Sequence, residues 1–292
     1  MANNEVSVAK FDKYRGEIVK TLVIGPADGS AKRDATPREL ETLEIVNLPC
    51  RPQSDLTGHP SFSALLKTLQ TLVLKFDYNW ANDKPHGGSQ QGKESQEFFT
   101  HLPKTWLAPA ATNLTCLTLG SSQLWGYVLK VDFSSVRFPR LQSLVMEQFV
   151  FCHNWQLIWI LSHKSLQKLC LLQCRILLGA IWTGGKDEDG YPTTLLKYDE
   201  TSLEKYYYSR SWNRYYDSFS RNLESLRWFT TKPNEWVETD LVGLYTTFDK
   251  YQWFPMVVGA DMRAKDEKMF EQLKAKTEER MREHLKATVN PR

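Results

Sequence analysis

The hydrophobic residues of this 292-residue chain recur in a short fixed pattern, L-x-x-L-x-L, in which Val, Ile, Met or Trp replaces Leu at some positions. The pattern occurs, in chain order, at residues 19–24, 40–45, 69–74, 114–119, 141–146, 166–171 and 223–228. One such match arises easily by chance in a leucine-rich chain. A series of matches in order indicates an internal structural repeat.

Leucines at this spacing are compatible with two structures. Leucines three residues apart share one face of an amphipathic helix, so a set of unrelated helices is the alternative to a strand repeat. The sixth position lies off a single helical stripe, however, and many positions between the leucines are β-branched, namely Thr21, Val23, Thr42, Thr71, Val73, Thr118 and Val145. Both features favour short strands, in which successive side chains point to opposite faces.

The intervals between the segments indicate where the repeat is regular. Most segments begin about 20–29 residues apart, which is the usual period of leucine-rich repeats. The longer interval before residue 114 contains 82–95, a polar stretch with several glycines that predicts a loop insertion. The longest interval contains 203–208, where Tyr stands in place of Leu, and this segment fits either a degenerate repeat or a helix.

Segments 61–69, 97–102 and 155–161 lie between the expected strands and carry apolar residues at helical spacing. A strand and its return segment cannot bury their apolar side alone, so neighbouring units must stack. We therefore predict an α/β fold: an irregular leucine-rich-repeat solenoid over 15–231, curved, with a parallel sheet on its concave side and short helices and loops outside. Residues 232–292 would form a C-terminal cap that includes a densely charged helix at about 264–287.

The residues that alternate with the inward leucines would point to the concave side of the sheet. The candidate protein-binding residues on this side are Val23, Glu44, Val73, Lys75, Thr118, Val145, Glu147, Cys170, Leu172, Arg227 and Phe229. Most concave positions are small or apolar, and an exposed apolar patch usually marks a binding site. The alternative is that loops or the C-terminal segment cover this face.

Composition and charge narrow the possible partners. The chain has 37 Lys and Arg against 34 Asp and Glu, a net charge of +3, which argues against a dedicated nucleic-acid binder. The first twenty residues lack the apolar core of a signal peptide, and no apolar run is long enough to span a membrane. Five cysteines do not form a paired framework. We expect a protein of the cytoplasm or nucleus with neither a nucleic-acid nor a membrane partner.

No segment has the spacing of a catalytic or cofactor-binding motif. The chain lacks the nucleophile elbow, the P-loop, the dinucleotide-binding loop and the zinc-protease motif. The acidic segment 184–190 predicts a solvated turn. Cys170, Cys174 and His163 lie close together in the sequence, but a zinc site would need further converging ligands, so we interpret these cysteines as structural, with Cys174 pointing inward. We expect no enzyme activity, no catalytic residue, no metal site and no cofactor.

Aromatic and basic residues alternate between residues 206 and 221. Such a stretch can stack on single-stranded nucleic acid, can contact a protein partner, or can be a helix with aromatic side chains in the core and arginines in water. Asp217 dilutes the positive charge, which favours core packing.

The chain resembles the fungal F-box proteins with irregular leucine-rich repeats. The resemblance covers about residues 15–230, and the residues that carry it are 113–119, 125–127, 138–144, 153–163 and 165–177. It implies a repeat region that recruits a protein substrate. It also implies an F-box that binds the Skp-type adaptor and cullin of an SCF-type ubiquitin ligase.

No F-box is found in this chain, because the first repeat begins near residue 19 and leaves no room for one before it. The adaptor and cullin are therefore expected as partners only if an F-box precedes this sequence. We predict a non-catalytic protein-recognition scaffold that resembles the substrate-binding part of an F-box subunit. The alternative is a stand-alone leucine-rich-repeat module without a role in ubiquitination.

Overall fold

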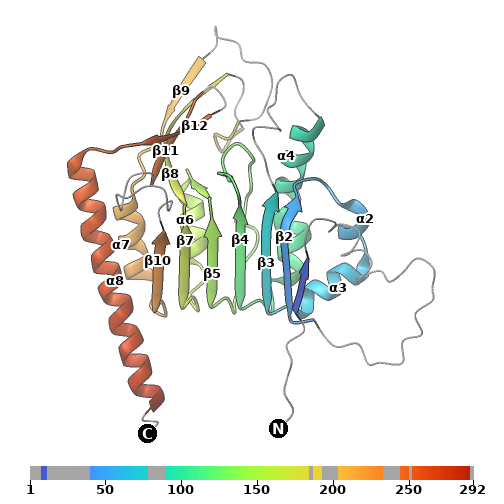
Figure 1. The fold of residues 1–292 in the computed structure, drawn as a ribbon, viewed down its shortest axis with the longest axis horizontal. Coiled ribbons are helices and arrows are strands. Elements are labelled where there is room, and N and C mark those ends of the chain that lie inside the picture. The colour runs from blue at the N-terminus through green and yellow to red at the C-terminus, as the bar shows by residue number, and fades with distance from the viewer. Residues whose placement is uncertain are drawn as a thin grey trace.

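A computed structural model describes residues 8–11, 40–77, 90–183, 187–192, 203–232, 244–249 and 252–289. These residues form a mixed α/β fold, built on a parallel sheet with helices packed against one of its faces (Figure 1). A second, mixed sheet lies at the end of the first where its strands terminate. The mixed α/β class and the parallel sheet agree with the prediction from the sequence.

The strands of the parallel sheet lie side by side in the order in which they occur in the chain. They are β1 (Val8–Phe11), β2 (Thr42–Pro49), β3 (Thr71–Asp77), β4 (Cys116–Ser121), β5 (Ser143–Glu147), β7 (Lys168–Leu172) and β10 (Trp228–Lys232). Each adjacent pair is parallel. The strand beside β2 is thus β1, and the expected first strand at 19–24 lies outside the described residues.

The repeated leucines line up across the sheet and form its buried side. Leu43, Leu72, Leu117, Leu144 and Leu169 occupy matching positions in five successive strands, and each is at most 2% exposed. Burying each such side chain contributes about 1.5–3 kcal/mol. Since no single strand can bury this row alone, the stacked leucines explain why consecutive repeats pack together.

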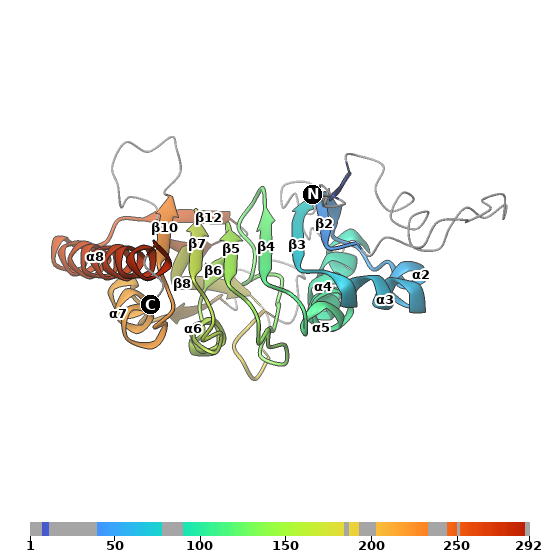
Figure 2. The ribbon, with the colours of Figure 1, turned by 90° about the horizontal axis from the view of Figure 1, so that it is seen from below.

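The connecting segments contain the helices, which lie on the leucine side of the sheet (Figure 2). They are α2 (Ser54–Thr57), α3 (Pro60–Thr68), α4 (Gln90–Leu102), the π-helical turn η1 (Pro103–Leu107), α5 (Ala108–Ala110), α6 (Asn154–Leu161) and α7 (Trp212–Asn222). The helices expected at 61–69, 97–102 and 155–161 are confirmed as α3, α4 and α6. Residues 90–95, expected in a loop, instead form the start of α4, and 82–89 lie outside the described residues.

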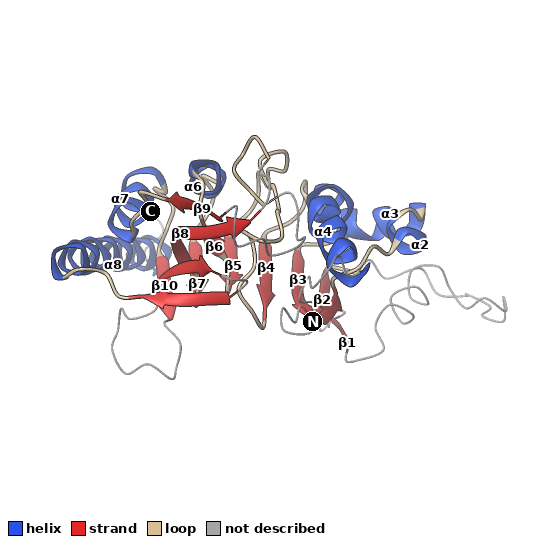
Figure 3. Ribbon diagram, turned by 90° about the horizontal axis from the view of Figure 1, so that it is seen from above, coloured by secondary structure: helices blue, strands red, loops and turns tan. Residues whose placement is uncertain are grey.

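The second sheet contains the strands that the sequence pattern did not reveal. They are β6 (Val150–Phe151), β8 (Arg175–Thr183), β9 (Leu203–Tyr207), β11 (Tyr245–Asp249) and β12 (Gln252–Met256). The order is β12-β11-β8-β6, and β9 pairs antiparallel with β8. The ambiguous segment 203–208 is therefore mainly a strand, although it does not belong to the parallel sheet (Figure 3).

Two strands of the parallel sheet pass directly into the second sheet through corners of two residues. Gln148 follows β5, and Gln173 follows β7, with φ angles of 59° and 54°. This left-handed conformation is uncommon for residues other than glycine, and it turns the chain sharply. After each corner the chain continues as β6 or β8, which pair with each other in parallel. The neighbouring strands β5 and β7 of the first sheet are therefore followed by neighbouring strands β6 and β8 of the second sheet.

Aromatic side chains fill the space between the parallel sheet, its helices and the second sheet. Trp125 is 1% exposed and lies at the centre, with ring centroids of Phe76, Phe99 and Phe149 at 5.2, 5.7 and 4.8 Å. Its indole Nε1 donates to the carbonyl oxygen of Glu147 at 2.7 Å. Much of the aromatic content therefore serves packing between irregular units.

The charged C-terminal helix expected at 264–287 is confirmed as α8 (Ala260–Val289), which lies beside β10 and α7 (Figure 1). Its Asp266 is 2% exposed and accepts hydrogen bonds from the backbone and side chain of Asn213 and from the hydroxyl of Tyr245. Arg280 donates to the carbonyl oxygen of Leu223 at 2.8 Å. These bonds fix α8 at the edge of the fold.

Candidate functional site

The face of the parallel sheet opposite its helices is the candidate binding surface, and we call it the open face (Figures 2 and 3). Its residues alternate with the buried leucines and line up across the strands. One row consists of Glu44, Val73, Thr118, Val145 and Cys170, one from each of β2, β3, β4, β5 and β7. The structure thus brings together five of the candidate residues that the sequence placed on this side.

Accessibility differs along this row. Val73, Thr118 and Val145 are half-buried, as expected for neighbours on a sheet surface, whereas Cys170 is only 5% exposed. Burial also raises the pKa of the Cys170 thiol. The part of the row over β3, β4 and β5 is accessible to a partner, while Cys170 is not.

The next row carries a charged pair. Lys75 on β3 and Glu147 on β5 form an ion pair of 3.1 Å between Nζ and Oε1, although β4 lies between their strands. Gly120 on β4 makes this possible, since a Cβ atom there would lie 2.6 Å from Oε2 of Glu147. An exposed ion pair contributes at most about 1 kcal/mol. Its main effect is to hold two opposite charges at fixed positions beside the Val73–Thr118–Val145 row.

Glu147 is also fixed through its backbone. Its carbonyl oxygen accepts the hydrogen bond from the buried Trp125 indole, and its neighbour across the strands on the other side is Leu172, which is half-buried. The carboxylate is therefore presented from a rigid part of the sheet. A partner would encounter this charge in one position.

The seventh repeat has a different register from the one the sequence predicted. The backbone amide of Arg227 donates to the carbonyl of Gln167, and Trp228 pairs with Lys168. Leu226 therefore corresponds to Leu166, the first leucine of its repeat, rather than to the fourth position. The true match begins at 226, three residues later than the segment we predicted, with Phe and Thr in place of two leucines.

Two predicted binding residues, Phe229 and Arg227, change place because of this register. Phe229 lies on the buried side, 8% exposed, and its ring contacts Tyr216 and Phe270. Arg227 precedes β10 and aligns with Gln167, so it is not an outward residue of the strand. Val23 lies outside the described residues. The prediction for Phe229 and Arg227 was wrong because two leucines three residues apart, Leu223 and Leu226, fit the pattern in two registers.

One residue of the open face was missed for the same reason. Trp228 is 54% exposed and stands beside Lys168 at the β10 end of the sheet. Tryptophan is enriched among residues that dominate protein–protein binding energy. A search that allowed Phe at the fourth position and Thr at the sixth would have found the register 226–231 and placed Trp228 outward.

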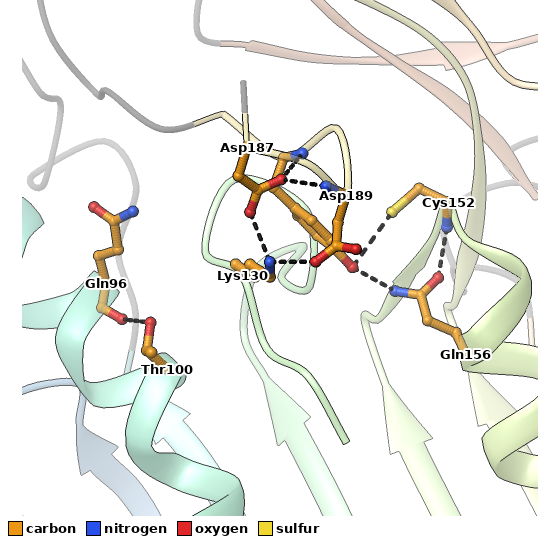
Figure 4. Close-up of polar contacts among 8 residues, drawn as sticks. Gln96, Thr100, Lys130, Cys152, Gln156, Asp187 and Asp189 are labelled. Atoms are coloured by element: carbon orange, nitrogen blue, oxygen red, sulfur yellow. Dashed lines mark hydrogen bonds and ion pairs between the residues drawn. The ribbon is translucent and has the colours of Figure 1, made fainter. Parts of the chain in front are cut away.

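A second polar cluster lies away from the open face, around the acidic segment (Figure 4). Lys130 Nζ lies 2.6 Å from a carboxylate oxygen of Asp187 and 2.6 Å from one of Asp189. Burial is the largest single influence on the pKa of Asp187 and acts to raise it, but the hydrogen bonds from Lys130 and from the backbone amides of Tyr191 and Asp189, together with the Lys130 charge, outweigh burial, so the pKa is lowered. The part of the expected solvated turn that the structure describes, from 187 onward, is therefore held in place by ion pairs to Lys130. Residues 184–186 lie outside the described residues.

Tyr191 joins this cluster to the core. Its ring is fully buried under the Lys130 ammonium group, with the nitrogen 5.2 Å from the ring centroid. Its hydroxyl lies 3.3 Å from Gln156 Nε2 and 4.0 Å from Cys152 Sγ (Figure 4). Burial raises the pKa of Cys152 to about 12 and lowers that of His153 to about 4, so both groups are neutral at pH 7. This arrangement stabilises the fold and offers no ionised nucleophile.

The cysteines near His163 have separate structural surroundings. Cys174 is 1% exposed and points inward, as predicted, with its thiol 3.3 Å from the carbonyl oxygen of Met146. Within the described ranges, no three His, Cys, Asp or Glu side chains converge as a metal site would require.

The aromatic and basic stretch is largely core. In α7, Trp212, Tyr215, Tyr216 and Phe219 are at most 1% exposed, while Arg214 faces solvent. This agrees with the interpretation as a helix with buried aromatic residues. Tyr207, before the helix, is the exception and is 83% exposed.

No family model, curated protein or solved structure matches the chain. Within the part of the chain that the structure describes, no helix is both long and apolar enough to cross a membrane.

Proposed function

We propose that the parallel sheet and its helices form an irregular leucine-rich-repeat solenoid, and that this protein is a non-catalytic module that recognises another protein through the open face. The stacking of consecutive strands in chain order supports the solenoid. Rows of aligned side chains on one sheet face are the surface that such repeats present to a partner.

The observation that carries this proposal is the composition of the central open face. Half-buried Val73, Thr118 and Val145 adjoin a fixed pair of opposite charges, Lys75 and Glu147. Small side chains, two of them apolar, allow close approach of a partner, and fixed charges give orientation and selectivity rather than affinity. The partner should therefore present an apolar strip flanked by one acidic and one basic residue.

A matched pair of variants tests this proposal. Thr118→Arg places a long charged side chain at the centre of the open face, and Thr100→Arg makes the same change at an exposed position of α4 on the helical side. Tagged wild-type and variant proteins would be purified from the native cells after cross-linking, and their partners identified by mass spectrometry. We expect a specific partner to be lost with Thr118→Arg and kept with Thr100→Arg. Equal recovery with both variants would refute the open face as the binding site.

We further propose that this module acts as the substrate-binding part of an F-box-type subunit of an SCF ubiquitin ligase, a proposal that rests on the resemblance of the repeat region. The longest product of the gene should then co-purify with the Skp-type adaptor and the cullin, and the open-face partner should accumulate when the gene is deleted. A stable partner whose turnover is unchanged by deletion would instead identify a stand-alone binding module.

A further inference from the structure

The second sheet has one face packed in the core and one face outside. Phe248 and Ala180 are buried, and Tyr206 and Trp253 pack against the core. The residues that alternate with these four point to the other side. These residues form the outer face of the second sheet.

A hollow on this outer face lies between two aromatic residues. Tyr207, Gly179, Thr247 and Phe254 occupy one row across β9, β8, β11 and β12. Tyr207 is 83% exposed and Phe254 is 43% exposed, and both project from the sheet surface. Between them the surface is lower, because Gly179 has no side chain. The resulting pocket has a volume of about 290 Å³, and both aromatic residues line it. It is large enough for one long side chain of a partner.

Asp249, two residues beyond Thr247, also lines the pocket. Its Oδ1 atom is buried and has no hydrogen-bond partner among the residues that the structure describes. A carboxylate oxygen removed from water without a donor is unfavourable, so a ligand that supplies donors at this point would gain affinity. Lys205 on β9 also lines the pocket, with β8 between it and Asp249 on β11, and no ion pair joins the two side chains within the described residues.

We propose that this pocket binds an arginine side chain of a partner protein. A guanidinium group is planar, so it stacks on the ring of Tyr207 or Phe254, and its N–H groups match the geometry of a carboxylate such as Asp249. The aromatic walls and the unpaired carboxylate are complementary to this one group in both shape and charge. The exposed ammonium group of Lys205 opposes a second positive charge, which limits the pocket to a single arginine.

The pocket is separate from the open face, and a short arginine peptide tests it directly. The peptide acetyl-Gly-Arg-Gly-amide would be titrated into protein labelled at Ile and Thr methyl groups, with the citrulline peptide as the uncharged control of the same shape. We expect the Ile181 and Thr247 methyl signals to shift with the arginine peptide, and citrulline to bind at least about tenfold more weakly. Equal binding of the two peptides, or no binding of the arginine peptide, would overturn the proposal.

Single substitutions test which residues of the pocket bind the arginine side chain. Asp249→Asn should weaken arginine binding at least about tenfold, whereas Asp261→Asn, the same change on exposed α8, should not. Lys205→Gln should leave binding equal or tighter. Asp249→Asn should also unfold at the same temperature as wild type or higher, since it removes an unpaired carboxylate. Unchanged binding by Asp249→Asn would contradict the assignment, and so would its destabilisation.

The outcome is distinguishable from that of the proposed function. Thr118→Arg lies on the parallel sheet and should keep full affinity for the arginine peptide. Loss of peptide binding with Thr118→Arg, while Asp249→Asn binds normally, would place the arginine site on the open face and refute the pocket.

Discussion

Acidification from pH 7 to pH 5 should destabilise this protein through His163, which follows α6 by two residues. His163 is 2% exposed and lies between the rings of Phe138 and Trp159, with centroids at 5.7 and 4.9 Å. Burial lowers its pKa to about 4, and this outweighs the backbone contacts with Ile160 and Trp159, which act to raise it. The folded protein therefore holds this imidazole in its neutral form.

The sign and size of the effect follow from proton linkage. An exposed histidine in the unfolded chain has a pKa of about 6.5, so below that pH the unfolded state binds a proton that the folded state rejects. Stability is present above pH 6.5 and is lost as the pH falls toward 4. A difference of about 2.5 pKa units corresponds to about 3.4 kcal/mol in full, of which about 2 kcal/mol is lost between pH 7 and pH 5.

Urea unfolding followed by circular dichroism at both pH values measures this loss. His163→Leu removes the titrating group, and His284→Leu makes the same change at an exposed position of α8. The free energy of unfolding should fall by about 2 kcal/mol more in wild type and in His284→Leu than in His163→Leu. The reasoning is refuted if all three proteins lose the same stability on acidification.

Three further changes test other parts of the fold by the same unfolding assay. Trp125→Ala should cost about 3–5 kcal/mol because it empties the aromatic core, whereas Trp228→Ala should change stability by less than about 0.5 kcal/mol; equal effects would contradict the burial difference. Lys130→Met should cost about 1–2 kcal/mol at pH 7 because it removes the ion pairs to Asp187 and Asp189. Since contacts that include Lys130 lower the pKa of Asp187, this cost should shrink as the pH falls and Asp187 takes up a proton; a cost independent of pH would rule out the ion pairs as its source. Gly120→Ala should destabilise by about 1–2 kcal/mol because its methyl group displaces Glu147, and most of that loss should disappear in the background of Glu147→Ala; additive effects would show that the two residues do not compete for space.

The regular repeats could be predicted from the sequence because their signal is local. A leucine at the first, fourth and sixth positions defines both a strand and its buried face, so Leu72, Leu117 and Leu144 were placed correctly. The same alternation placed Thr118 and Glu147 outward. A strand with one buried side and one exposed side has alternating apolar and polar residues, so its two faces can be predicted from its sequence.

The remaining features depend on contacts between distant segments. The ion pair between Lys75 and Glu147 requires a glycine on the strand between them, and no local pattern links these three residues. Cys170 occupies an outward position but is buried by its surroundings. The second sheet was missed because strands such as β11 are short and pair with a segment about 70 residues earlier, without a repeated leucine pattern.

The corners at Gln148 and Gln173 have a consequence for how the molecule unfolds. Each joins a strand of one sheet to a strand of the other through two residues, and the amide of Gln148 donates to the carbonyl oxygen of Leu172, which links the two corners. Because no linker separates the sheets, neither can open without distorting strands that belong to the other. The amides of β7 and β8 should therefore exchange with deuterium as a single cooperative unit, with similar protection on both sides of Gln173.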